Sequence, residues 1–212
     1  MYQQKFINRK EELKFLNKAY KSRNPELIVI SGRRRVGKTE LILQFLKNKK
    51  GLYFLASTEG DRENINNFKK EIGSLIKDHE FSNIEFKDWY SLFDALSKNI
   101  HFVRLLKKDK VVIAIDEFPN LIHSNPSIPS VFQKIWDVIL KKLNILLILC
   151  GSSVSMMEEH VLSIKSPLYG RRTGQWEVAP LSFIYLKEFF KGYAIEDLIK
   201  VWFVLGGIPE YL

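Results

Sequence analysis

The sequence predicts an α/β protein in which helices cover both faces of a parallel sheet. Short, wholly apolar runs of strand length alternate with amphipathic helical segments up to Pro180, and after it the pattern changes to helices alone. Strands without an apolar/polar alternation are typical of parallel sheets that are buried on both faces. We therefore expect an α/β domain over residues 1–180 and, over residues 181–212, the start of a helical lid that continues in a longer protein.

The element boundaries follow from apolar periodicity and from turn residues. Pro25 ends the N-terminal helical segment, and Pro119 introduces a turn-rich stretch before the next helix. We expect helices over residues 5–23, 41–46, 61–77, 89–106, 131–140, 183–190 and 195–205, and a short one from residue 154. We expect strands over residues 27–30, 51–57, 111–117, 144–150 and 175–179, and we expect the second to be buried on both faces.

Residues 28–40 contain Gly-x-x-x-x-Gly-Lys-Thr between a strand and a helix, which is the context of a phosphate-binding P-loop. Gly32 and Gly37 allow the backbone to curl, so that successive N–H groups face phosphate oxygens at a helix N-terminus. Lys38 would reach the β- and γ-phosphates of a nucleotide, and the Thr39 hydroxyl would hold Mg²⁺. The nucleotide-binding residues expected in this segment are Gly32, Arg33, Arg34, Arg35, Val36, Gly37, Lys38, Thr39 and Glu40.

Two carboxylates follow the most apolar strand of the chain. Asp116 and Glu117 end the run that begins at Val111, at the carboxyl edge of the sheet, where open α/β sheets bind ligands. Asp116 would hold Mg²⁺ directly or through water. Glu117 would accept a proton from the water that attacks the γ-phosphate, or would orient that water. The alternative is a pair of solvated acids that simply end a buried strand.

Small polar residues and arginines supply the remaining catalytic candidates. Ser152 or Ser153, after the strand over residues 144–150, could place a hydroxyl near the γ-phosphate or could only begin a turn, and we select Ser153. Arg171, with Arg172 as the alternative, could stabilise a developing phosphoryl charge in cis or from a neighbouring subunit. The run Arg33–Arg35 is expected to face solvent or a partner rather than to act in catalysis, because the loop amides already bind phosphate.

Composition limits the location and the partners of the protein. The chain has 212 residues and no apolar run long enough to span a bilayer, and its first five residues form no apolar leader, so we expect a cytoplasmic protein. The net charge of +9 would suit nucleic acid. However, lysines cluster between helices and the next strands, where they would complement helix C-termini at the edge opposite the phosphate site. These clusters are Lys47, Lys49, Lys50; Lys107, Lys108, Lys110; and Lys141, Lys142.

Together, the motifs resemble the archaeal ATPase family, a branch of P-loop ATPases related to the AAA+ and STAND groups. The matching segments are residues 6–13, 32–39, 113–118, 151–153, 167–171 and 206–212. The resemblance implies a five-stranded parallel sheet of order 5-1-4-3-2 followed by a helical lid. It implies that Phe6, Ile7 and Arg9 lie against adenine and ribose, that the serine after the fourth strand senses the γ-phosphate, and that Pro209 faces the nucleotide from the lid. Longer members continue into a winged-helix region and a further C-terminal domain.

Our first functional hypothesis is an Mg²⁺-dependent ATPase module that acts as a conformational switch or motor. The chain has no Asn-Lys-x-Asp motif for reading guanine, which favours ATP over GTP. An arginine finger supplied in trans would require a homo-oligomer, and DNA or a protein effector would bind through regions beyond residue 212. The alternative is a nucleic-acid-binding module in which ATP only controls conformation. A small-molecule kinase is a third hypothesis, disfavoured because two acids at a strand end suit water activation.

Overall fold

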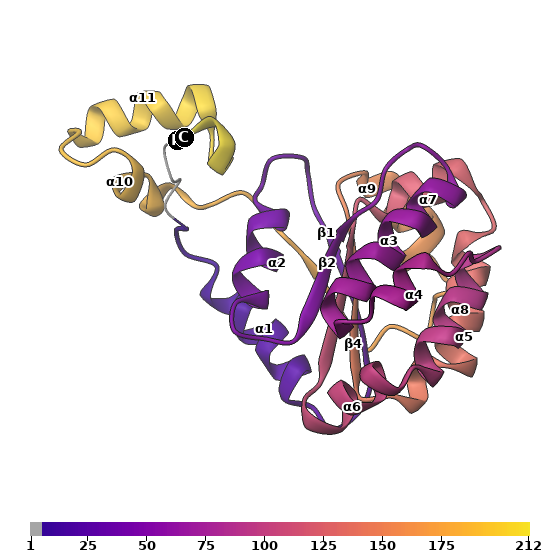
Figure 1. Ribbon diagram of the computed structural model, residues 1–212. Helices are drawn as coiled ribbons and strands as arrows, with labels where there is room; N and C mark the ends of the chain where they lie inside the picture. The colour runs from indigo at the N-terminus through magenta and orange to yellow at the C-terminus, as the bar shows by residue number, and fades with distance from the viewer. Residues whose placement is uncertain (1–5) are drawn as a thin grey trace.

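A five-stranded parallel sheet forms the centre of the structure, in the order β2-β3-β4-β1-β5 (Figure 1). This computed structural model describes residues 6–212. The expectation that the chain has no apolar leader concerns the first five residues, which lie outside the described residues. The strands are β1 Glu26–Ser31, β2 Gly51–Leu55, β3 Val111–Asp116, β4 Ile145–Gly151 and β5 Gly174–Glu177. Read from the β5 edge, the order is 5-1-4-3-2, so the predicted topology is confirmed.

Helices cover both faces of the sheet, because alternate residues of the central strands point to opposite sides. On one face, Val112 and Ala114 of β3 pack with side chains of α1 and α2. On the other face, Val111, Ile113 and Ile115 pack with α3 and with the helices that follow it. The helices are α1 Lys10–Lys21, α2 Lys38–Leu46, α3 Asp61–Ile76, α4 His79–Asn83, α5 Trp89–Lys98, α6 Ile100–Lys108, α7 Phe118–Ser124, α8 Ile128–Val138, α9 Val154–Met157, α10 Leu186–Phe189 and α11 Ile195–Leu205.

Aromatic side chains fill the larger of the two layers. The Phe68 ring lies 5.2 Å from that of Phe54, 5.4 Å from Trp89 and 5.5 Å from Phe93, measured between ring centroids. Phe132 of α8 continues the cluster, 5.7 Å from Trp89. Tilted and edge-to-face pairs of this kind add to the free energy gained from apolar burial. This cluster joins α3, α5 and α8 to the edge strand β2.

Several expected boundaries are wrong, and two of the differences have a clear local cause. The helix expected over residues 89–106 is two helices, because Asn99 ends α5 and its side chain caps α6 by accepting from the His101 and Phe102 N–H groups. Helix α8 begins three residues earlier than expected, since Pro129 lies in its first turn, where no N–H is needed. The short helices α4 and α7 were not expected from the sequence.

The strand expected over residues 51–57 is not buried on both faces. It is the edge strand β2, which ends at Leu55 and pairs with β3 alone. Gly51 and Tyr53 are half-buried and Leu55 is exposed, whereas Leu52 and Phe54 are buried. A short apolar run does not distinguish an edge strand from a central one, because both can consist of apolar residues.

The last helices form an extension beside the sheet. Figure 1 shows α10 and α11 apart from the layers that cover the sheet, beyond the N-terminal end of α2. The boundary at residue 180 between two domains stays a prediction. Over residues 6–212, no helix combines the length and the apolar character that crossing a bilayer requires.

We predict that Phe68→Ala lowers the free energy of unfolding by about 3–5 kcal/mol, because the deletion leaves a cavity inside the aromatic cluster. The Phe68 side chain is fully buried. Urea denaturation followed by circular dichroism measures the change. Phe203→Ala is the matched control, since Phe203 is 83% exposed on α11 and its truncation should change stability by less than about 0.5 kcal/mol. Equal losses in the two variants would contradict the assignment of the core.

Candidate functional site: the P-loop cavity

The P-loop runs from the end of β1 into the first turn of α2, in a conformation that its glycines permit. Gly32 has φ 143° and Gly37 has φ 90°. A Cβ at Gly32 would lie 2.5 Å from the Val178 carbonyl oxygen, so the loop can pass close to the chain after β5 only with glycine here. Lys38 is buried, and its ammonium donates to the Gly32 carbonyl at 2.8 Å and to the Arg33 carbonyl at 2.9 Å.

A cavity of about 850 Å³ opens above this loop, within the size range of small-molecule sites. Its wall combines the segment before α1, the P-loop, the ends of β3 and β4, and the extension. Of the residues expected to contact nucleotide, Phe6, Ile7, Arg9, Arg34, Arg35, Val36, Gly37, Lys38, Thr39, Glu40 and Pro209 line it. Sequence reasoning missed Leu181, Phe189 and Glu210, which line the wall on the side of the extension.

Asp116 lies at the base of this site, where three groups hold its carboxylate. It is 1% exposed, and its Oδ2 accepts from the Thr39 hydroxyl at 2.6 Å and from the Tyr53 hydroxyl at 2.9 Å. The Glu117 N–H donates to Oδ1 at 2.9 Å. Burial, and then the Asp116 charge, raise the pKa of Tyr53 well above its ordinary value, so this phenol remains a donor. Burial likewise raises the pKa of the neighbouring Cys150 thiol, which stays neutral.

Thr39 and Asp116 suit a hard divalent cation. A hydroxyl and a carboxylate, already in contact, are oxygen ligands of the kind that Mg²⁺ prefers. Within residues 6–212, no group of three or more His, Cys, Asp or Glu side chains is placed to hold a metal ion. A cation here would therefore complete its coordination with phosphate oxygens and water, which is how Mg²⁺ is held in nucleotide sites.

Glu117 adopts a left-handed backbone conformation, with φ 50° and ψ 42°, between β3 and α7. Such a conformation costs a non-glycine residue on the order of 1–3 kcal/mol and is concentrated at functional sites. Its Oε2 accepts from the Ser152 hydroxyl at 2.9 Å, and Ser152 is buried on the cavity wall. Ser153, which the sequence favoured, instead precedes α9 as its N-cap residue and accepts the Met157 N–H through its carbonyl. The geometry therefore brings Ser152, and not Ser153, to the carboxylate.

All three P-loop arginines are exposed, as expected, and two of them also contact other parts of the chain. Arg34 lines the cavity, and its Nε donates to the Ser152 hydroxyl at 3.4 Å. Arg35 pairs with Glu210 at 3.2 Å and stacks on the Tyr211 ring. These contacts join residues more than a hundred positions apart, and no signal in the sequence indicates them.

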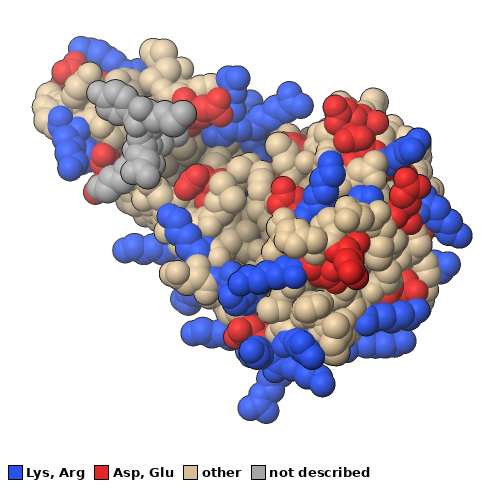
Figure 2. Space-filling model, in the orientation of Figure 1, with Lys and Arg blue, Asp and Glu red and all other residues tan. Residues whose placement is uncertain are grey.

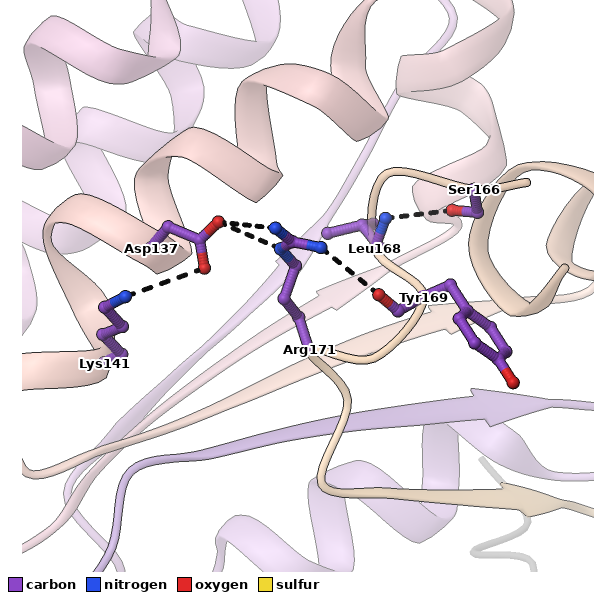
Figure 3. Close-up of polar contacts among 6 residues, drawn as sticks. All are labelled: Asp137, Lys141, Ser166, Leu168, Tyr169 and Arg171. Carbon is purple, nitrogen blue, oxygen red and sulfur yellow. Dashed lines mark hydrogen bonds and ion pairs between the residues drawn. The ribbon is translucent and has the colours of Figure 1, made fainter. Parts of the chain in front are cut away.

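Arg171 is not among the residues that line the cavity, so this arrangement gives no support to an action in cis. Figure 3 shows it beside Asp137 instead. Its guanidinium binds Asp137 of α8 through Nε at 3.0 Å and Nη2 at 2.9 Å. The chain just after it pairs with the beginning of β1, since the Thr173 N–H donates to the Leu27 carbonyl. With a rise of about 3.3 Å per residue, that point is about 16 Å from the start of the P-loop. Arg172, the alternative, donates to the Leu162 carbonyl instead.

Arg9 forms part of the cavity wall, where its guanidinium joins three segments of the chain. It is buried, and it donates to Glu12 at 2.9 Å, to the Ala179 carbonyl at 2.8 Å and to the Val36 carbonyl at 2.7 Å. Hydrogen bonds from a charged donor are stronger than neutral ones. Arg9 therefore fixes the segment before α1 against the P-loop and against the chain after β5.

A family profile described as an ATPase domain predominantly from Archaea matches residues 6–212. The chain is 46% identical over 207 residues to an uncharacterized protein of Methanocaldococcus jannaschii. The aligned region covers 98% of this chain and 43% of that protein. The chain thus spans less than half the length of that relative.

Two solved structures show that the fold is shared. The Walker-type ATPase of Pyrococcus abyssi superposes with a TM-score of 0.74 at 23% identity, over 96% of this chain and 65% of that one. A STAND protein with a tetratricopeptide repeat sensor from Pyrococcus horikoshii superposes with a TM-score of 0.59 at 16% identity, over 96% of this chain and 28% of that one.

We predict that Arg9→Met lowers the free energy of unfolding by about 2–4 kcal/mol, because the buried Val36 carbonyl loses a charged hydrogen-bond donor. Urea denaturation measures the loss. Arg104→Met is the matched control, since Arg104 is exposed on α6, and its replacement should change stability by less than about 0.5 kcal/mol. If Arg9→Met were as stable as its control, the three-way contact would have no structural role.

Proposed function

We propose that this chain, which belongs to the family of ATPase domains found predominantly in Archaea, binds Mg²⁺–ATP and hydrolyses it to ADP and phosphate. The observation that carries the proposal is the hydrogen bond from the Thr39 hydroxyl to Asp116 at the base of the P-loop. The Lys38 ammonium lies at the same loop, where it donates to the Gly32 carbonyl. Bound Mg²⁺ would neutralise charge on the β- and γ-phosphate oxygens. The amides of the loop and the Lys38 ammonium would bind the same phosphates.

Glu117 is the group we assign to the attacking water. Its carboxylate accepts the water proton as the water oxygen bonds to the γ-phosphorus, and the bond from that phosphorus to the ADP oxygen breaks. Ser152 supports this role, because its hydroxyl donates to Glu117 Oε2 and fixes the direction of the carboxylate. We therefore assign to Ser152 the role near the γ-phosphate that the sequence analysis assigned to Ser153.

Arg34 is the cation we assign to the developing phosphoryl charge within one chain. It lies on the cavity wall beside Ser152, whereas Arg171 is paired with Asp137 near the opposite edge of the sheet. A guanidinium suits this charge because it presents several donors in one plane. Arg171 can act on a nucleotide only in a neighbouring copy, which requires a homo-oligomer.

The contacts of the extension support a role as a switch or motor. Arg35 belongs to the P-loop, yet it pairs with Glu210 and with Tyr211 at the end of the extension. Pro209 and Phe189 line the same cavity. A nucleotide between these walls would therefore bind both the sheet and the extension, and loss of the γ-phosphate would change what holds them together. This change in the position of the extension would be transmitted to DNA or to a protein effector that binds through regions beyond residue 212.

We predict that Lys38→Ala abolishes ATP binding, because the phosphates lose their buried cation, and that Glu117→Gln keeps binding while turnover falls at least about 100-fold. Calorimetric titration with ATP and Mg²⁺ measures binding, and phosphate release measures turnover. Lys200→Ala, on the exposed side of α11, serves as the surface control and should change neither quantity. Normal turnover by Glu117→Gln would show that this carboxylate is not the base.

We predict that Arg34→Ala lowers the rate of hydrolysis about 100-fold with little change in ATP affinity, because its cation acts mainly on the transition state. Arg171→Ala should leave the rate per molecule unchanged in dilute protein. Phosphate release at increasing protein concentration separates the two arginines. A rate that rises with concentration and depends on Arg171 would instead support a finger supplied in trans.

A further inference from the structure

Basic side chains gather at the amino edge of the sheet, opposite the P-loop. In a parallel sheet, the segments that lead into the strands all lie at one edge. Here the segments before β1, β2, β3 and β4 are residues 21–25, 47–50, 107–110 and 141–144. We call this group of four segments the basic edge. In Figure 2, Lys and Arg side chains lie along the lower side of the α/β domain, where Figure 1 places the end of α1 and the turn after α6.

Two lysines of the basic edge have structural roles. Lys110 is buried, and its ammonium donates to the Asn24 carbonyl at 2.6 Å and to the Ala19 carbonyl at 3.1 Å, which ties α1 to the start of β3. Lys49 donates to the Phe45 carbonyl and lies over its ring, and burial lowers its pKa. These two residues need no ligand to explain them.

The other cations of the basic edge are exposed. Seven of these cations make no ion pair with any described residue. The four segments contain one acidic residue, Asp109. The seven are Lys21, Arg23, Lys47, Lys50, Lys107, Lys108 and Lys142. Like charges held this close repel one another, so the arrangement costs free energy unless a ligand or counterions neutralise it.

Helix dipoles account for only part of this set. Lys21, Lys107 and Lys108 lie in the last turns of α1 and α6, where a cation is stabilised by about 0.3–1 kcal/mol. The last turn of α2 has no basic residue, because Lys47 and Lys50 follow the helix. Lys142 belongs to a single 3₁₀ turn, Leu140–Lys142, whose dipole is small. Helix dipoles therefore leave four of the seven unexplained, namely Arg23, Lys47, Lys50 and Lys142.

We propose that the basic edge binds the phosphate backbone of duplex nucleic acid without reading its sequence. The four segments stand side by side in the order of their strands, over about 14 Å at about 4.8 Å per strand. One nucleic-acid strand presents about four phosphates over that length. None of the exposed large apolar side chains belongs to these segments, so the edge offers neither an apolar anchor for a membrane nor an aromatic platform for bases.

This surface is separate from the nucleotide cavity. The strands carry the chain from the basic edge to the P-loop, and the six residues of β1 span about 20 Å. Both ligands can therefore be bound at once, and the two sites can be altered independently. The proposal does not depend on ATP hydrolysis, and its test uses no nucleotide.

Fluorescence anisotropy of a labelled 30-base-pair DNA, titrated with the protein at several NaCl concentrations, tests the proposal. We expect log K to fall against log salt concentration with a slope of about −3 to −4, since each neutralised phosphate contributes about −0.9. Lys107→Glu combined with Lys108→Glu should weaken binding at least tenfold in 50 mM salt and should reduce the slope by about two. Lys47→Glu combined with Lys50→Glu, in the neighbouring segment before β2, should have the same effect.

The control variant has the same change in net charge as the test variants, but on the extension instead of the basic edge. Lys187→Glu combined with Lys191→Glu alters two exposed lysines of the extension and should change affinity less than threefold. Thermal melting verifies that every variant is folded. The proposal is overturned if the unaltered protein binds no duplex in 50 mM salt, or if the control loses as much affinity as the two test pairs. Binding to phosphatidylserine vesicles without binding to DNA would overturn it in favour of a membrane.

Discussion

The structure of the site depends on one buried carboxylate. Asp116 is 1% exposed at the end of β3, and it accepts hydrogen bonds from Thr39 of α2 and Tyr53 of β2. A charge in that position would be costly without such donors. The same contacts hold the P-loop helix and the edge strand β2 at the end of β3. The requirement to satisfy Asp116 therefore fixes the base of the cavity before any ligand enters it.

The parallel sheet separates two kinds of surface. Its carboxyl edge gathers the P-loop, Glu117 and Ser152 around the cavity, because loops that leave parallel strands meet at one edge. Its amino edge gathers lysines that precede the strands. The net charge of +9 is thus not spread evenly over the molecule. A single topological property, the common direction of the strands, accounts for the position of both surfaces and for the distance between them.

Local signals in the sequence predicted the parts of this structure that short segments determine. The apolar run from Val111 to Asp116 predicted the buried strand β3, the P-loop glycines predicted the phosphate loop, and the family resemblance implied the strand order. Contacts between distant residues were not predictable. The pairing of Arg171 with Asp137 depends on how α8 packs after the sheet has formed. Ser152 and Glu117 follow the neighbouring strands β4 and β3, but the sequence does not show which of the two serines after β4 turns toward the carboxylate. Periodicity also could not show that Asn99 interrupts a helix, since the apolar stripe continues on both sides of it.

If the proposed function is correct, a bound nucleotide would act on the extension through an exchange of hydrogen bonds at the P-loop. Lys38 already donates to two carbonyls of the loop, and Arg35 already pairs with Glu210, so neither cation is free of partners. Phosphate oxygens would therefore replace existing partners, and the net free energy of each exchange would be much smaller than that of a new ion pair in isolation. Because Arg35 connects the loop to the extension, a competing phosphate near it would weaken a contact between the two. Under the proposed function, a near-balanced exchange of this kind would let one γ-phosphate shift a conformational equilibrium without first breaking the fold.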